Sequence, residues 1–236
     1  MKRFWSTAAA VRHTNGTDGY AVQLDGKPVR LPAGPPLAVP SAALAHAIAA
    51  EWQAAGVATG MMEYADVPLT RLAGTAQLRI LPDPAPTAAA IAVYGESDLL
   101  CYRATTPPAL VMQQAEAWDP WLEWSRTTIG AALEVTSGIT HVRQHPLAVR
   151  ALAAATAAQG PWVLAGLGIV VPALGSLVLG LAVAHGALPV DEAHRLSTVD
   201  ETYQAGLWGE DADAVIRRAH IARDLAEAAQ FMALVR

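Results

Sequence analysis

The chain has 236 residues, of which 53% are hydrophobic and only 16% are charged, and its formal net charge is −5 at pH 7. That length holds apolar material for one large or two small domains, and the abundance of alanine favours helices packed through small side chains. Because lysine and arginine are few and dispersed, the composition argues against binding to nucleic-acid backbones.

Cys101 is the only cysteine, which rules out an intramolecular disulfide, CxxC redox chemistry and a four-cysteine zinc site. A chain of this kind suits a reducing compartment. The N-terminal segment 1–13 carries basic residues but lacks the seven-residue apolar core of a secretory signal. We therefore expect a cytoplasmic protein.

A β-hairpin is predicted near the N-terminus. Residues 20–25 alternate in character, Asp25-Gly26 has the composition of a two-residue turn, and a second extended run passes through Val29 and Leu31. Prolines then forbid a long helix and confine strands to edge positions; they stand at positions 28, 32, 35, 36 and 40. The first eighty residues are therefore expected to be rich in β-structure.

The first predicted helix spans about residues 42–55, with Ser41 as its N-cap. Leu44, Ile48 and Trp52 recur at every fourth position and form one stripe that faces the sheet. We therefore interpret Trp52 as a core residue and not as a ligand contact. A charge at this position is expected to unfold the small domain, because it would be a buried, unpaired ion.

The proline-rich segment 81–88 is the predicted domain boundary. Its three prolines remove three amide donors within five residues and stiffen the connection. A cut here gives residues 1–80 as a small β-rich domain with one helix, and residues 81–236 as a larger, all-helical domain. The expected fold class is therefore α+β.

Helical patterns dominate after this boundary. Helices are predicted over about residues 87–95, 108–118 and 211–234. Asp119 and Pro120 have the composition of a new helix start, with the aspartate as cap and the proline at the first helical position. The segment 135–142 is predicted to be a short extended interlude.

Residues 162–184 form an uncharged run of 23 residues, long enough to cross a bilayer as a helix. The run contains four glycines and Pro172, and it lacks the basic flank that anchors spanning helices. We therefore expect two buried helices, with Pro172 breaking or kinking the run, and no stable membrane insertion. A membrane-associated protein is the alternative.

Two acidic pairs have the spacing of catalytic carboxylates. Glu96 and Asp98 are two residues apart, and Asp200 and Glu201 are adjacent. Helix caps and solvated faces explain such pairs more simply, and Ser97 or Asp98 can cap a following turn. We expect no acid–base catalysis from them.

Other patterns for catalysis or ligand binding are incomplete. His141 and His145 are four residues apart, but Pro146 follows directly and no acidic third ligand is near. Glycine-rich phosphate loops are missing, Ser176 lacks the GxSxG context, and Cys101 has no assured histidine partner. The sequence therefore predicts no catalytic residue, no metal site and no cofactor, and it favours a binding protein over an enzyme.

The chain has seven tryptophans and five tyrosines against two phenylalanines, which suits both cores and protein interfaces. Trp118, Trp121 and Trp124 recur at every third position and form a broad band on one side of a helix. We favour a core role for this band. Trp208 is expected near the surface, at a junction between helices.

An ordered set of motifs runs along most of the chain: YGESDLLCYR at 94–103, LGSLVL at 174–179, DETYQ at 200–204 and WGED at 208–211. Further members are RF at 3–4, LDGKPVRLPA at 24–33, AEW at 50–52, PLTRLA at 68–73 and WDPWLEW at 118–124. In this order they resemble the family of ATP synthase F1 complex assembly factor 2, chaperones of the F1-ATPase alpha subunit. The chain departs from the family pattern at Val67, Gly74 and Thr75.

The resemblance implies a small α+β N-terminal domain followed by a helical C-terminal domain, in agreement with the cut at the prolines. It also implies a chaperone whose partner is the unassembled F1 alpha subunit. Such a chaperone masks the surface that the beta subunit later covers, and it is displaced by that larger interface without using ATP. A monomer is favoured, with the oligomeric state left open.

The resemblance further implies site residues. An acidic residue of the DETYQ motif is functional in the family, and Glu201 corresponds to it. We expect Glu201 to contact the client, or to position Arg195 and Tyr203 for that contact. Weaker partner-binding candidates from the same motifs are Asp200, Tyr203, Trp208, Glu96 and Asp98. A small-molecule enzyme and an interaction module with a different client are the alternatives.

Overall fold

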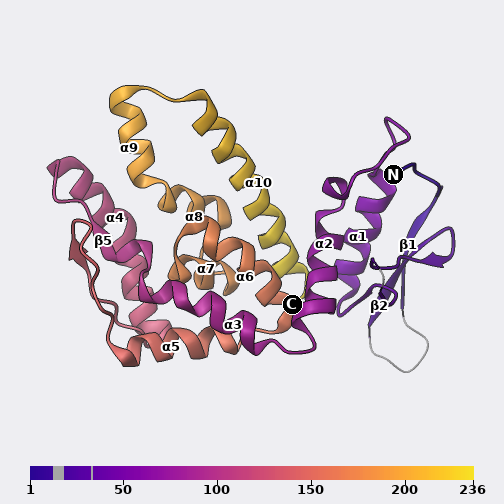
Figure 1. Ribbon diagram of the computed structural model, residues 1–236, viewed down its shortest axis with the longest axis horizontal. Helices are drawn as coiled ribbons and strands as arrows, with labels where there is room; N and C mark the ends of the chain where they lie inside the picture. The colour runs from indigo at the N-terminus through magenta and orange to yellow at the C-terminus, as the bar shows by residue number, and fades with distance from the viewer. Residues whose placement is uncertain (13–18, 33) are drawn as a thin grey trace. The chain divides into compact units, whose positions relative to one another are not determined.

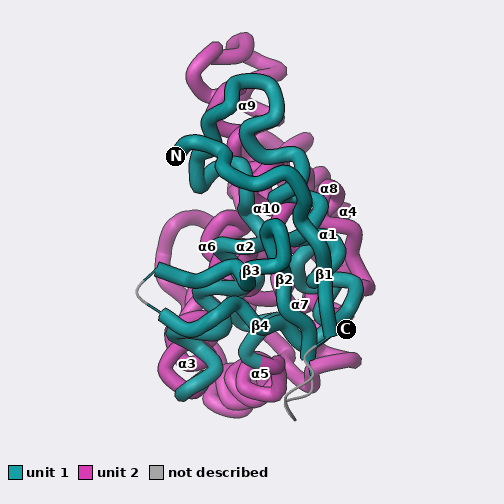
Figure 2. Tube along the Cα trace, turned by 90° about the vertical axis from the view of Figure 1, so that its right-hand side faces the viewer, with its two compact units in different colours: residues 1–84, 161–166, 230–236 teal, residues 85–160, 167–229 magenta. Residues whose placement is uncertain are grey.

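The computed structural model describes residues 1–12, 19–32 and 34–236, which divide into two compact units (Figure 2). Unit 1 comprises residues 1–84, 161–166 and 230–236, and unit 2 comprises residues 85–160 and 167–229. The sequence analysis placed the boundary after residue 80 and assigned residues 161–166 and 230–236 to the second domain, whereas the structure groups both segments with unit 1. Each of them is the end of a longer helix, so no change of composition marks it in the sequence.

Unit 1 contains an antiparallel sheet in which β2 is central (Figure 1). Its strands are β1 (Ala8–Arg12), β2 (Tyr20–Leu24), β3 (Lys27–Pro28) and β4 (Ala38–Val39). β2 pairs with β1 along its whole length, with β3 at one end and with β4 at the other. The predicted hairpin is confirmed as β2–β3. Its turn uses the left-handed backbone of Asp25 (φ 46°) and Gly26 (φ 79°).

Helix α1 (Ala42–Ala54) packs on β1 and β2 and begins as predicted, because the Ser41 side chain accepts a hydrogen bond from the Leu44 amide at 3.1 Å. Leu44, Ile48 and Trp52 are all buried, which confirms the predicted stripe. The unit is completed by η1 (Tyr64–Asp66), α2 (Pro68–Thr75) and the π-helical turn η2 (Ala76–Ile80).

Unit 2 is built mainly of helices. The longer helices that contribute to it are α3 (Ala85–Ala92), α4 (Pro108–Trp124), α5 (Pro146–Ala157), α6 (Pro161–Leu174), α7 (Leu177–Ala184), α8 (Val190–Ser197), α9 (Val199–Trp208) and α10 (Ala212–Leu234). Shorter helical turns are η3 (Val93–Glu96), η4 (Leu99–Cys101) and η5 (Ser125–Ile129). A short parallel pair, β5 (Tyr102–Arg103) and β6 (Thr136–Ser137), is its only sheet among the described residues. β6 lies in the predicted extended interlude. The expected α+β class is confirmed.

The predicted helix restart at Asp119 is wrong, because α4 runs through it without a break. Pro120 lies inside the helix, where it removes one backbone donor but does not end the element. Asp119 does not cap a helix. Its carboxylate instead pairs with Arg103 at 2.7 Å.

The uncharged run forms two helices, as predicted, but the break does not come at Pro172. Helix α6 continues past this proline to Leu174, and Gly175 then ends it in a left-handed conformation (φ 63°). Ser176 starts α7 by accepting a hydrogen bond from the Leu179 amide. Within the described residues, no helix combines the length and the apolar character needed to cross a bilayer.

Candidate partner-binding site

Two of the sequence motifs, 94–103 and 174–179, meet in unit 2 at Asp98. This side chain is fully buried, and its carboxylate accepts hydrogen bonds from the amides of Leu100 at 3.1 Å and Val178 at 3.0 Å. The Leu99 amide also donates to the Gly175 carbonyl at 3.0 Å. Burial raises the pKa of the Asp98 carboxyl against the opposing effect of these hydrogen bonds. Asp98 therefore caps η4, as predicted, and connects the two motifs.

Two further residues of the first motif are packed in the interior. A Cβ atom at Gly95 would lie 2.7 Å from a methyl carbon of Leu152 and 3.2 Å from one of Leu177, so only glycine fits at this position without movement of its neighbours. Cys101 is buried, and burial raises the pKa of its thiol to about 12. The thiol is therefore protonated and a poor nucleophile at neutral pH.

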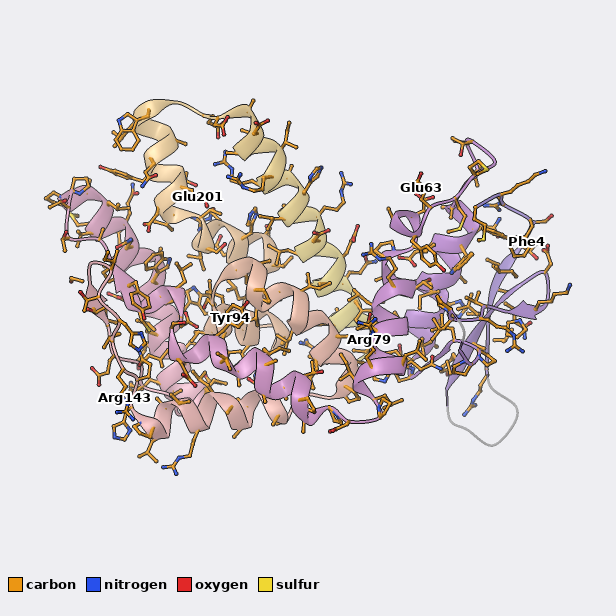
Figure 3. All side chains as sticks on the ribbon, in the orientation of Figure 1. Phe4, Glu63, Arg79, Tyr94, Arg143 and Glu201 are labelled. Atoms are coloured by element: carbon orange, nitrogen blue, oxygen red, sulfur yellow. The ribbon has the colours of Figure 1, made fainter. Side chains whose placement is uncertain are left out.

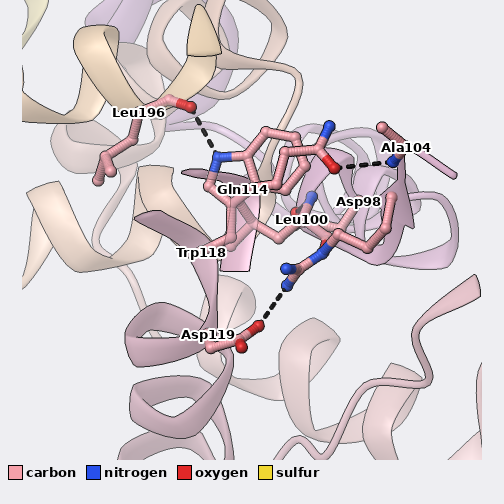
Figure 4. A network of polar contacts seen from close by, with 8 residues as sticks. Asp98, Leu100, Ala104, Gln114, Trp118, Asp119 and Leu196 are labelled. Atoms are coloured by element: carbon pink, nitrogen blue, oxygen red, sulfur yellow. Dashed lines mark hydrogen bonds and ion pairs between the residues drawn. The ribbon is translucent and has the colours of Figure 1, made fainter. Parts of the chain in front are cut away.

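Arg103 joins the end of the same motif to α4. Figure 4 labels its partner Asp119 on α4, together with Trp118 and Leu196. Its guanidinium donates to the Leu100 carbonyl at 3.0 Å, pairs with Asp119 at 2.7 Å and lies 5.2 Å from the ring centroid of Trp118. Trp118 is buried and donates to the Leu196 carbonyl at 2.8 Å, which ties α4 to α8. The core role predicted for the tryptophan band is confirmed for this residue.

Gln114 connects α4 to α9. Its buried side-chain oxygen accepts from the Ala104 amide at 2.7 Å, and its side-chain nitrogen donates to the Asp200 carboxylate at 2.6 Å. Asp200, the first residue of the DETYQ motif, therefore faces α4. This charge-assisted hydrogen bond connects α9 to α4.

The side of α9 next to Asp200 borders a groove of about 840 Å³, which we call the α4–α9 groove. Its lining residues all belong to unit 2: Gln113, Glu116, Ala117, Pro120 and Trp121 of α4, Glu192, Arg195 and Leu196 of α8, and Val199, Thr202, Tyr203, Gly206 and Leu207 of α9. Tyr203 and Trp121 bring aromatic rings from two different helices, and both are half-buried. The sequence-predicted Tyr203 thus lies in a surface depression.

Glu201 lies on a different side of α9 and is exposed (Figure 3). Its carboxylate acts on His194 of α8: burial lowers the pKa of that histidine, the Glu201 carboxylate raises it, and Arg218 of α10 lowers it. The lowering effects prevail. The Nε2 atom of His194 is buried and has no hydrogen-bond partner among the described residues. The expectation that Glu201 positions Arg195 finds no support, because Arg195 pairs with Glu192 at the groove.

This geometry predicts the protonation of His194. We expect its pKa to lie below 6.5, to fall further in Glu201→Gln and to rise in Arg218→Gln. Because the unfolded chain binds this proton more readily, the contribution of His194 to stability is present above pH 6.5 and is lost as the pH falls through the folded pKa. Histidine-resolved NMR titration of the three proteins measures these shifts. Identical values in all three would contradict the placement of Glu201 near His194.

The end of α9 and the start of α10 expose apolar side chains. Trp208 is 80% exposed, Leu207 59%, Ile216 55% and Val215 39%. A tryptophan exposed to this degree is uncommon in a folded protein, because burying its ring yields more free energy than burying any other side chain. The sequence indicated a surface position for Trp208, but it gave no signal for Leu207 or Ile216.

Glu96 lies apart from these features, in a second depression of about 320 Å³ that is also lined by His141, Arg143 and Arg150. His141 is engaged through Nδ1, which is 3.1 Å from the Tyr102 hydroxyl. In the described part of the chain, no three histidine, cysteine, aspartate or glutamate side chains come together as a metal site would require. The structure therefore separates the six predicted residues. Asp98 is buried, Asp200 is hydrogen-bonded to Gln114, and the other four lie in four different places: Glu201 near His194, Tyr203 in the α4–α9 groove, Trp208 at the end of α9 and Glu96 in the second depression.

Comparison with known proteins gives concordant matches. The model of the ATP12 chaperone protein family matches residues 2–126. The crystal structure of Atp12 from Paracoccus denitrificans is 38% identical, with a TM-score of 0.92 over 100% of this chain and 98% of that chain, and an aspartate-to-lysine mutant of the P. denitrificans protein matches equally well. The Atu1473 protein from Agrobacterium tumefaciens is 35% identical, with a TM-score of 0.91 over 100% of this chain and 86% of that one. The chain belongs to the ATP12 chaperone protein family.

Proposed function

We propose that this protein is a chaperone for assembly of the F1 sector of ATP synthase, and that it binds the unassembled alpha subunit. Family membership supports the chaperone class, and the ordered motifs resemble those of F1 assembly factors. The observation that carries a binding function is the exposed apolar surface at the end of α9, where Trp208 and Leu207 face solvent. Exposed apolar side chains of this size mark surfaces that bind other proteins.

The chaperone masks the surface of alpha that beta later covers. The chaperone therefore has to bind alpha more tightly than alpha binds a second copy of itself. It also has to bind alpha less tightly than beta does in the final complex. An exchange of this kind is driven by a difference in binding free energy, so it needs neither nucleotide nor a catalytic residue. This fits a site composed of aromatic, aliphatic and carboxylate side chains.

Glu201 is proposed to contact a basic or polar group of the client directly. The carboxylate is exposed on α9 and makes no ion pair among the described residues, so it is available to a partner. Trp208 lies at the end of the same helix and is proposed to provide apolar contact area. Asp200 connects α9 to Gln114 of α4, whereas Asp98 is buried and holds the start of α7, so only Asp200 is next to the proposed client surface.

The test is co-purification of the tagged protein with its partners from its own host. The native chain is expected to recover alpha without beta, and Glu201→Lys is expected to recover about tenfold less alpha, as reversal of an interfacial charge often does. Glu134→Lys is the matched control, because this exposed glutamate bonds to Gln144 only through its backbone.

Each outcome is decisive. Recovery of no alpha by the native chain would contradict the proposed client. Equal recovery of alpha by the native chain and by Glu201→Lys would support alpha as the client but contradict the proposed contact through Glu201. A loss in both lysine variants would show a general charge effect and not a site.

A further inference from the structure

The α4–α9 groove has lining chemistry that the proposed function does not use. We propose that it holds a segment of the alpha subunit in which a lysine or arginine side chain stands beside an apolar one. This inference rests on the proposed function and adds to it the chemical class of the segment that is recognised. The argument depends on the groove's size, its aromatic walls and its uncompensated charge.

The volume of about 840 Å³ falls in the range of specific binding pockets, about 300 to 1,000 Å³. A space of this size accommodates a few side chains of one segment, not a folded domain. The groove is therefore suited to the anchor of a larger interface. Anchors of this kind contribute most of the binding energy when they fill a desolvated pocket.

The walls favour long side chains with an apolar stem. Trp121 from α4 and Tyr203 from α9 contribute rings on two sides, and the remaining lining is largely small or aliphatic, including Ala117, Leu196 and Val199. Lysine and arginine place their methylene groups along such surfaces and bring their cationic heads close to ring faces.

The charge of the groove selects a cation. Three charged side chains line it, and two of them, Glu192 and Arg195, neutralise each other in an ion pair. The third, Glu116, is exposed and makes no ion pair among the described residues. One uncompensated carboxylate in a groove that is also lined by two aromatic rings attracts a basic side chain and disfavours an acidic one.

The groove continues into the exposed apolar end of α9. Leu207 lines the groove and is also 59% exposed, and Trp208 follows it directly. Acidic residues come next in the chain, at Glu210, Asp211 and Asp213, of which only Glu210 forms an ion pair in the described structure, with Arg218. A client segment that leaves the groove in this direction meets apolar and then acidic surface, so basic and apolar residues suit it along its length.

The experiment measures binding of purified alpha subunit to four versions of the full chain: native, Glu116→Lys, Tyr203→Ala and Glu134→Lys. We expect Glu116→Lys and Tyr203→Ala each to raise the dissociation constant about tenfold or more, and Glu134→Lys to leave it unchanged. Melting temperatures of all four verify folding. A photoreactive amino acid in place of Gln113, which is exposed in the groove, is expected to crosslink to one alpha segment that contains lysine or arginine beside apolar residues.

The failure of this inference is distinguishable from failure of the proposed function. If the native chain binds no alpha, both are overturned. If it binds alpha and the two groove variants match Glu134→Lys, only the groove assignment is overturned. A crosslink to an acidic segment, or to a second copy of this chain, would also overturn it.

Discussion

Replacing Trp52 by lysine is expected to destabilise unit 1 by at least about 3 to 5 kcal/mol, the usual cost of truncating a buried tryptophan. The indole is only 7% exposed and donates to the Thr70 hydroxyl at 2.9 Å. Trp5 packs against it with ring centroids 5.1 Å apart and donates to its backbone carbonyl at 2.9 Å. A lysine would leave a cavity and place an unpaired ammonium group in it. Because small domains are stable by only about 5 to 15 kcal/mol, this loss removes a large part of the stability of unit 1.

The matched control is Trp52→Phe, which keeps an aromatic ring and loses the hydrogen bond to Thr70. Its cost is expected to be smaller, because most of the buried apolar area remains. Urea unfolding followed by circular dichroism, with amide NMR spectra to resolve unit 1, measures both variants. A lysine variant as stable as the phenylalanine variant would show that the site opens to solvent at little cost.

The elements that the sequence predicted are those whose signals are local. The Asp25-Gly26 turn needs positive φ at both positions, and these residue types tolerate it. Ser41 caps the residues that directly follow it. The α1 stripe follows from helical spacing alone. Each signal involves residues within one or two turns of each other, so no tertiary information was required.

The elements that differ from the sequence predictions depend on tertiary contacts. Asp119 and Pro120 look like a helix start, but α4 continues because Trp118 and Gln114 hold the helix in the core. Strand β1, with the sequence AAAVR, was not predicted because alanine has little β-propensity, and its pairing with β2 supplies the structure.

The sequence motifs named candidate site residues but did not show how their side chains are arranged in space. The motifs placed Asp200, Glu201 and Tyr203 within four positions, whereas the helix turns them toward three different surroundings: Gln114, His194 and the α4–α9 groove. Glu116 and Trp121 join Tyr203 from about eighty residues away in the sequence. Contacts at such separation leave no trace in a single sequence.

Replacing Asp98 by alanine is expected to destabilise unit 2 by about 2 to 6 kcal/mol, because two buried backbone amides each lose an acceptor at about 1 to 3 kcal/mol. The carboxylate joins η4 to the start of α7, eighty residues later in the chain, and solvent cannot replace it at a fully buried position. Asp98→Asn keeps one acceptor oxygen and is expected to cost less than alanine. Denaturant unfolding at neutral pH measures both.

Glu96→Ala is the control for this prediction, because Glu96 belongs to the same motif and is exposed, so its loss is expected to change stability by no more than about 0.5 kcal/mol. Equal stability of the Asp98 and Glu96 variants would mean that the motif is not held together through this carboxylate. If Asp98→Ala is much less stable than Glu96→Ala, the buried contact of Asp98 gives a physical reason for two of the sequence motifs. The segments 94–103 and 174–179 would then share a buried contact, whereas DETYQ lies within α9, which presents the proposed client surface, and WGED begins at Trp208, the last residue of that helix.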